Sequence, residues 1–249
     1  MTTPTVALVR GELLRLRTVR APWLLLLAAQ FIVVTGVSGL VLGGADLDSR
    51  ADQSKAVAHV GLAALFTLVF GLLAVAGEYR HRTITDTYLS TPQRGRVIAS
   101  KLGVYGVIGL ASGLVGAAVA LASAAAWWAG KGSSFDFSST LMWRTLLGGV
   151  LWNAAFAVVG VGLGALVRNL VGAIAAALAW IALVEGIVGQ LVGDTLSRWL
   201  PFKAGQALGL ADADGSDLLP QWGGGVLLLA YTAVFAMIAV STTLRRDVT

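Results

Sequence analysis

The chain has 249 residues, of which 57% are hydrophobic and only 12% are charged, and its mean hydropathy is +0.80. A soluble domain carries about 25% charged residues, so this composition excludes a water-soluble fold, which would expose large apolar patches. The absence of cysteine excludes disulfides and thiolate metal sites. The formal net charge of +5 does not require nucleic acid as a partner, because basic residues gather on one side of a membrane protein.

Six segments are long and apolar enough to cross a bilayer, because about 20 residues of helix span its hydrocarbon core. A bilayer interior admits only helices or closed barrels, and these segments lack the alternation of barrel strands. We therefore predict an all-α polytopic membrane protein with a single transmembrane domain over residues 1–249. The predicted transmembrane helices cover residues 22–44, 57–77, 102–129, 145–167, 169–192 and 220–244.

Basic residues are distributed unevenly between the two sides of such a protein. Twelve lie on the side that holds both termini, and six lie on the other side. The positive-inside rule then predicts that both termini are cytoplasmic and that the chain is a multi-pass protein of the cell membrane, either plasma or inner membrane.

Residues 4–20 predict an amphipathic helix on the cytoplasmic interface. Thr3 and Pro4 suit a helix start, with threonine as N-cap and proline at the first helical position. Apolar residues then recur at spacings of three and four, and arginines near lipid headgroups lie off this stripe. The stripe is Val6, Val9, Leu13 and Leu16, and the arginines are Arg10, Arg15 and Arg17. The alternative is a polar cap before the first span.

The connection over residues 78–101 predicts a short helix. Thr83 and Asp86 fit a capping box, and Ile84 and Tyr88 share one face at a spacing of four, with Leu89 beside them. A proline at position 92 ends this helix and starts the next one. The result is a short helix with an apolar and aromatic face and basic flanks. Basic residues that only set the membrane topology would need no such helix, whereas a docking surface would.

The external connection over residues 193–219 is unusually apolar for a solvated loop, since its first half contains Leu196, Trp199, Leu200 and Phe202. It predicts one or two short helices that lie on the outer leaflet or dip into it. An acidic turn over residues 212–217 follows them.

Glu185 is the only acid inside a predicted span. Two interpretations remain open, because an intramembrane carboxylate is often a proton or cation site. The alternative is a carboxylate near the outer interface, paired or hydrated where glycines kink the helix end.

Catalytic and nucleotide-binding motifs are missing from the sequence. The two histidines, His59 and His81, fall on opposite sides of the membrane, so they predict no shared metal site. None of the four lysines stands in a P-loop motif, so the chain has no P-loop ATPase site of its own.

The arrangement resembles the permease subunits of type-2 ABC transporters, whose exporter fold is shared with ABCG-type transporters. Their pattern has a glutamate at the end of helix 2, a short helix with threonine, a proline followed by arginine, and a lysine that enters helix 3. The matching residues are Glu78, Thr83, Pro92, Arg94 and Lys101. The N-terminal helix, the six spans and the "WLP" stretch before helix 6 match as well.

The resemblance implies that the short helix is a coupling helix, seated in a cleft of a separate cytoplasmic ATPase. Its docking residues would be Glu78, Thr83, Ile84, Asp86, Tyr88, Leu89, Pro92 and Arg94. The N-terminal helix would be the connecting helix, with Arg10, Leu13 and Arg17 near the same subunit.

Further implications concern the assembly. Six spans form half a transporter, so the resemblance implies two ATPase subunits and a second permease, identical or homologous, among membrane lipids. ATP and Mg would be bound by the partner ATPase, and this chain would bind no cofactor. A hydrophobic or amphipathic cargo (drug, lipid or peptide) would pass between the permeases, where Glu185 on helix 5 could line its path. The alternative function is an ion-coupled secondary transporter that uses Glu185. An intramembrane enzyme is disfavoured, because the sequence contains no set of catalytic residues.

Overall fold

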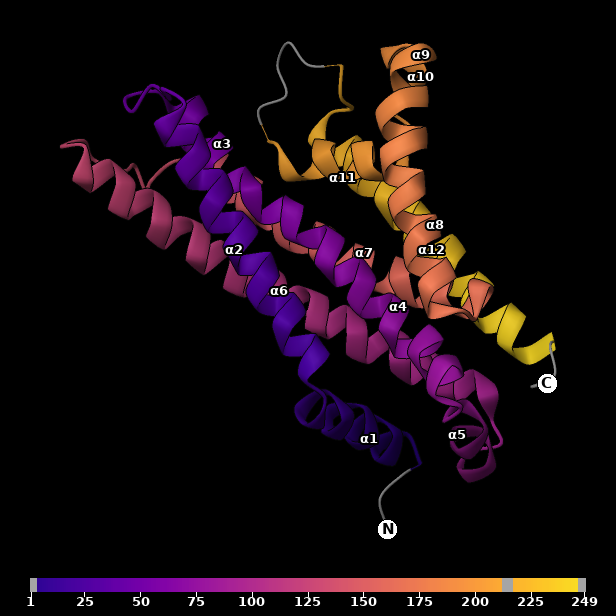
Figure 1. Ribbon diagram of the computed structural model, residues 1–249. Coiled ribbons are helices and arrows are strands. Elements are labelled where there is room, and N and C mark those ends of the chain that lie inside the picture. The colour runs from indigo at the N-terminus through magenta and orange to yellow at the C-terminus, as the bar shows by residue number, and fades with distance from the viewer. Residues whose placement is uncertain (1–3, 212–216, 246–249) are drawn as a thin grey trace.

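The computed structural model describes residues 4–211 and 217–245, and these residues form helices and connections without any strand (Figure 1). Six of its helical segments are long and apolar enough to cross a membrane, so the predicted all-α polytopic fold is confirmed. The segments are Arg20–Leu42, Arg50–His81, Arg94–Gly130, Thr140–Val167, Leu170–Leu191 and Gln221–Ser241. The chain is a multi-pass membrane protein.

The helical elements follow one another with short connections. In the first half of the chain they are α1 (Pro4–Thr18), α2 (Arg20–Leu42), α3 (Arg50–Ala58), the 3₁₀ turn η1 (His59–Ala63), α4 (Ala64–His81), α5 (Ile84–Ser90) and α6 (Arg94–Gly130). In the second half they are α7 (Thr140–Val167), α8 (Leu170–Ala179), the π-helix η2 (Trp180–Val188), α9 (Gly189–Leu191), α10 (Asp194–Ser197), α11 (Pro201–Gly209) and α12 (Gln221–Arg245).

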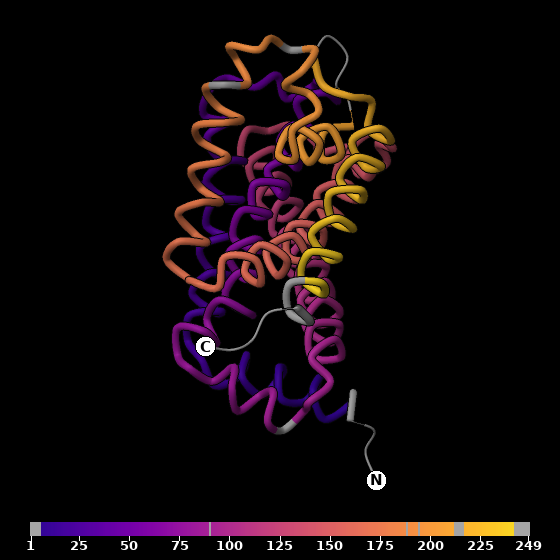
Figure 2. Tube along the Cα trace, turned by 90° about the vertical axis from the view of Figure 1, so that its right-hand side faces the viewer, coloured from indigo at the N-terminus to yellow at the C-terminus, as the bar shows by residue number. Residues whose placement is uncertain are grey.

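The bundle has two ends that differ in structure. At one end, called the α5 end, α1 and α5 lie beside the ends of the long helices, and α12 runs towards this end (Figure 1). At the other end, called the α11 end, α3 forms the start of the second span, and α11 packs against α7 and α12 (Figure 1). Figure 2 shows α11 lying between the fifth span and α12.

Two central helices, α4 and α7, form the core of the bundle. In the most apolar 18-residue stretch of the two spans that contain α4 and α7, 72% and 61% of the residues are buried, against 17–33% in the other four spans. The outer helices therefore keep broad apolar faces exposed on the monomer. Such faces are stable in lipid, where apolar side chains need no burial against protein.

Glycines allow α4 and α7 to approach closely. A Cβ atom added to Gly71 would lie 2.0 Å from the carbonyl oxygen of Ala157, and one added to Gly160 would lie 2.1 Å from that of Leu68. Small residues bring helix backbones together in this way in membrane proteins. Gly164 of α7 lies against α4 in the same way, and Gly109 and Gly113 of α6 lie against α7.

Several helices begin earlier than the apolar pattern predicts. The second span starts at Arg50 with Ser49 as N-cap, whose side chain accepts a hydrogen bond from the amide of Asp52, so the expected loop before residue 57 is partly helical. Likewise, α7 starts at Thr140 with Ser139 as N-cap, and α6 runs from Arg94 without a break. Serine caps hold the early starts of the second span and of α7, whereas the Gln93 side chain makes no capping hydrogen bond at the start of α6.

The segment between the fifth and sixth spans contains two short helices, α10 and α11, as the sequence predicted. The predicted acidic turn over residues 212–217 lies outside the described residues except for Asp217. The predicted N-terminal helix is present as α1, which begins at Pro4.

Candidate functional site

A buried ion cluster joins α1, α4 and α6 at the α5 end. Lys101 of α6 is fully buried, and its Nζ donates hydrogen bonds to Glu12 of α1, to Glu78 Oε1 (2.8 Å) and to the carbonyl of Ala74 on α4 (3.0 Å). Arg15 of α1 also reaches Glu78 Oε1 at 2.7 Å. A charge without a partner is very unfavourable in a buried site, so these contacts fix the three helices relative to one another.

The cluster contains two acids and two bases, so its formal charges balance. The hydroxyl of Tyr105 on α6 also donates to Glu12 Oε2, at 3.4 Å. The resemblance drew on Glu78 and Lys101, whereas a role for Glu12 was not predicted. A signal was present, because Glu12 follows Val9 by three residues and precedes Leu16 by four, which places an acid in the apolar stripe.

The short helix α5 begins directly after this cluster. Arg82 adopts a left-handed backbone conformation (φ 57°) and ends α4, and the amide of Thr83 donates to the carbonyl of Glu78 at 3.0 Å. The predicted capping box is wrong, because the Thr83 side chain makes no capping hydrogen bond. The backbone carbonyl of Thr83 instead accepts hydrogen bonds from the amide and the hydroxyl of Thr87.

The predicted docking face of α5 divides into a buried part and an exposed part. Ile84 is only 3% exposed on this chain, so its side chain is not part of the surface of α5, and Glu78 is 5% exposed within the ion cluster. Leu89 is 76% exposed, and the guanidinium of Arg94 lies 5.2 Å from the centre of the Tyr88 ring, within the range of a cation–π contact.

A hollow of about 280 Å³ lies beside α5. It is lined by Thr85, Tyr88, Leu89, Pro92 and Arg94, so it contains four of the eight residues that the sequence assigned to docking. Asp86 is exposed in the first turn of α5, where a negative charge is favourable, and Thr83 lines a separate cavity between α1 and α4.

The residues assigned to the N-terminal connecting helix lie on the surface of α1. Arg10 and Arg17 are exposed and Leu13 is 47% exposed, whereas Glu12 is buried. The apolar residues Val9 and Leu16 pack against the core beside α4 and α6. One face of α1 is therefore fixed to the bundle, and the other is free to meet lipid or protein.

Glu185 lies towards the other end of the bundle, where it binds the first turn of α11. Its Oε1 accepts from the Phe202 amide at 2.9 Å and from the Trp180 indole at 3.2 Å, and its Oε2 accepts from the amides of Phe202 and Lys203 at 2.9 and 3.0 Å. An acid at a helix N-terminus stabilises the unpaired amides there. The geometry therefore matches the interpretation of Glu185 as a paired structural carboxylate.

No metal site is formed by the residues that the structure describes. The Nδ1 atom of His59 lies 3.0 Å from the carbonyl of Ala56, and the ring packs against Gly36 of α2. His81 is exposed at the α5 end, so the two histidines lie far apart along one continuous helical segment.

No protein-family model matches the chain, and no curated protein matches it either.

Proposed function

We propose that the chain is the permease subunit of an ATP-driven exporter of the type-2 ABC class, with α5 as its coupling helix and α1 as its connecting helix. The observation that carries this proposal is the position of α5. This helix offers the exposed Leu89 and the hollow lined by Tyr88 and Arg94, and it follows directly on a buried ion cluster that ties three helices together.

The arrangement suits the transfer of motion from a partner into the membrane domain. A partner seated on α5 would push on the end of α4 and the start of α6, because α5 connects them within a few residues. The contacts of Lys101 with Glu12 and Glu78 would carry that displacement to α1 and to the central helix α4. Packed elements move as rigid bodies, so a small displacement at α5 becomes a tilt of whole helices.

The proposed orientation places the α5 end in the cytoplasm. This end carries the basic residues of α1 and of the α4–α5–α6 connection, and the positive-inside rule favours such residues on the cytoplasmic side. A cytoplasmic ATPase could then reach α5, and it would bind the ATP and Mg that this chain has no P-loop to hold.

The proposed cargo is hydrophobic or amphipathic, namely a drug, a lipid or a peptide moved out of the cytoplasm or the inner leaflet. Six spans correspond to half a transporter, so two permeases, identical or homologous, and two ATPases would assemble, with the cargo path between the permeases. The competing function, an ion-coupled transporter that uses Glu185, gains less support because both oxygens of that carboxylate already accept hydrogen bonds from the chain.

The test is purification of the full chain from its native membrane in mild detergent, followed by mass spectrometry of the proteins that accompany it. The proposal expects a P-loop ATPase in stoichiometric amount with ATP hydrolysis in the purified complex. A homo-oligomer without any ATPase would refute it.

Two matched variants then test the docking surface. Leu89→Asp places a charge on the exposed face of α5, and Leu196→Asp places the same charge on an exposed leucine of α10 at the α11 end. We expect the first variant to fold but to lose the ATPase, and the second to retain it. Equal retention by both variants would contradict a docking role for α5.

A further inference from the structure

A groove of about 600 Å³ lies between α1 and α6 at the α5 end. Val9 and Leu13 of α1 form one wall, and a stripe along α6 forms the other, with residues at helical spacings of three and four. The stripe consists of Arg96, Ala99, Ser100, Gly103, Val104, Val107 and Ile108. The hydroxyl of Ser100 donates to the Val97 carbonyl, so the groove is apolar apart from Arg96 at one end.

The groove runs from the level of the headgroups into the hydrocarbon layer. Arg96 lies about 9 Å along the helix axis before residue 102, where the apolar segment of α6 begins, and Ile108 lies about 9 Å beyond it. The wall is open at Gly103, where an added Cβ would have no neighbour within 4 Å. Ala99, Gly103 and Val107 are exposed, so the groove opens on the surface that faces lipid.

The basic residues beside the groove have no acidic partners. Arg10 and Arg17 lie three residues before and four residues after Leu13, so they follow the same side of α1. Arg10, Arg17 and Arg96 are exposed, and none forms a salt bridge with an acid of the described residues. The one acid of α1, Glu12, is buried in the ion cluster. These three arginines therefore keep a positive charge that can attract an anion.

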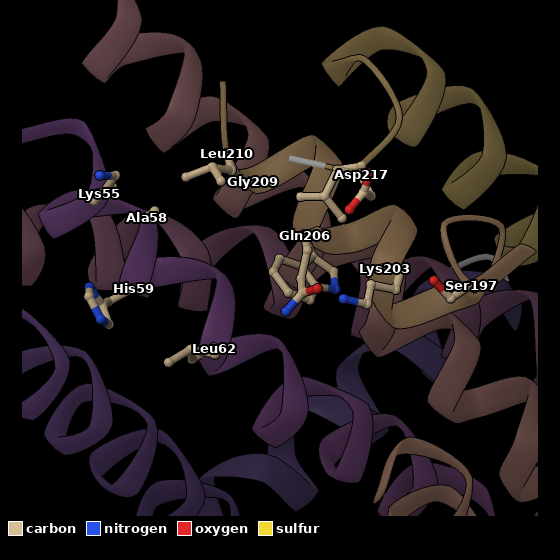
Figure 3. Close-up of a pocket in the computed structure, with 12 residues that line it drawn as sticks. Lys55, Ala58, His59, Leu62, Ser197, Lys203, Gln206, Gly209, Leu210 and Asp217 are labelled. Atoms are coloured by element: carbon tan, nitrogen blue, oxygen red, sulfur yellow. The ribbon is translucent and has the colours of Figure 1, made fainter. Parts of the chain in front are cut away.

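The cavity at the α11 end differs from this groove in its charges (Figure 3). It has a volume of about 470 Å³, and its lining includes Lys55, Lys203 and Asp217. Lys55 is paired with Asp52 at 2.9 Å. Lys203 lies beside Glu185, whose carboxylate accepts a hydrogen bond from the Lys203 amide at 3.0 Å. The charges of that cavity are therefore balanced, and the groove at the α5 end is the better place for an anion.

We propose that the groove between α1 and α6 binds one anionic phospholipid of the surrounding leaflet. Its phosphate would lie beside Arg96 and the arginines of α1, and one acyl chain would fill the groove along Gly103. The positive end of the α6 dipole lies in the same first turn as Arg96 and also favours a phosphate there. The proposal does not rest on the ATPase partner, because lipid binding is measured on this chain alone.

The test is native mass spectrometry of the purified full chain in a neutral detergent. The chain is titrated with phosphatidylglycerol or with phosphatidylcholine of the same acyl chains. We expect saturable binding of one phosphatidylglycerol per chain, about fivefold or more tighter than binding of phosphatidylcholine. A single basic residue near an anionic headgroup contributes about that factor.

Two matched pairs of variants separate the headgroup from the acyl chain. Arg96→Gln should weaken phosphatidylglycerol binding about fivefold, whereas Arg80→Gln, at an exposed arginine of α4 outside the groove, should not. Gly103→Leu fills the groove and should abolish saturable binding, whereas Gly11→Leu should not. Both glycines leave open space around an added Cβ, so both variants should fold, but only Gly103 lines the groove.

Equal affinity for the two lipids would overturn the proposal, as would equal binding by the Arg96 and Arg80 variants. A loss with Arg96→Gln that Gly103→Leu does not share would overturn it as well, because it would indicate attraction to headgroups without an acyl-chain site. If Gly103→Leu fails to fold, Val107→Trp replaces it at an exposed position of the same wall, with the same expected loss.

Discussion

Replacing Lys101 by methionine tests whether the buried ion cluster holds α1, α4 and α6 together. The variant removes the fully buried ammonium that contacts Glu12, Glu78 and the Ala74 carbonyl, and methionine fills a similar volume. Arg15 would then pair with Glu78 alone, and Glu12 would keep no paired base among the described residues. Removing one partner of a buried ion pair costs about 3–5 kcal/mol, because the other partner is left uncompensated.

This cost is large compared with the total stability of a folded domain, which is about 5–15 kcal/mol. A loss of 1 kcal/mol lowers the Tm of a chain of this size by about 2–4 °C, so we expect Lys101→Met to lower the Tm by roughly 6–20 °C. The measurement is thermal unfolding of the detergent-purified protein followed by circular dichroism. The control is Lys131→Met, which changes an exposed lysine and should leave the Tm nearly unchanged.

A double variant separates the loss of charge balance from the loss of packing. Glu12→Gln combined with Lys101→Met leaves Glu78 and Arg15 as an intact pair at 2.7 Å, so no carboxylate lacks a base. We expect the double variant to be more stable than the two single effects would predict, by about 0.5–3 kcal/mol, as for residues in one ion network. Strict additivity, or a Tm of the Lys101 variant equal to that of the control, would refute the reasoning.

The remaining predictions concern packing, α5 and α11. Gly71→Ala should lower the Tm, because the added Cβ would meet the rigid backbone of α7, and such overpacking lowers the free energy of unfolding by about 1–3 kcal/mol. Gly103→Ala should leave the Tm unchanged, because no atom lies within 4 Å of the added Cβ. Ile84→Asp should reduce the amount of folded protein in the membrane, because it buries a charge, whereas Leu89→Asp should not, as immunoblots of the two variants would show. Glu185→Ala should speed hydrogen exchange at the first amides of α11 but not in α6, and unchanged exchange in α11 would contradict its capping role.

The existence and type of the spans could be predicted from the sequence, because long uncharged apolar segments have only one stable form in lipid. Their ends could not be predicted equally well. Ser49 and Ser139 cap helices that extend into polar sequence, and α6 continues through several basic residues to Arg94. Hydropathy measures how much of a helix suits hydrocarbon, whereas capping and tertiary contacts decide where the helix ends.

The candidate site was predicted less completely, because helix periodicity describes a face without saying what covers it. Ile84 and Tyr88 share a face at a spacing of four, but Ile84 is buried where the chain leaves α4. The π-helix around Glu185 was also invisible to periodicity.

The burial of Glu78 and Lys101 changes what they can do in the proposed mechanism. A docking residue has to contact the partner, yet Glu78 is only 5% exposed and Lys101 is fully buried, so neither can form a large part of an interface. Their contacts run inward to α1 instead. Variants of these two residues should therefore leave the affinity for an ATPase nearly intact and reduce the transport obtained per ATP hydrolysed, whereas variants of Leu89 should reduce the affinity itself. This division between transmission and contact rests on the proposed function together with the burial of these residues, and it can be measured on a single purified complex.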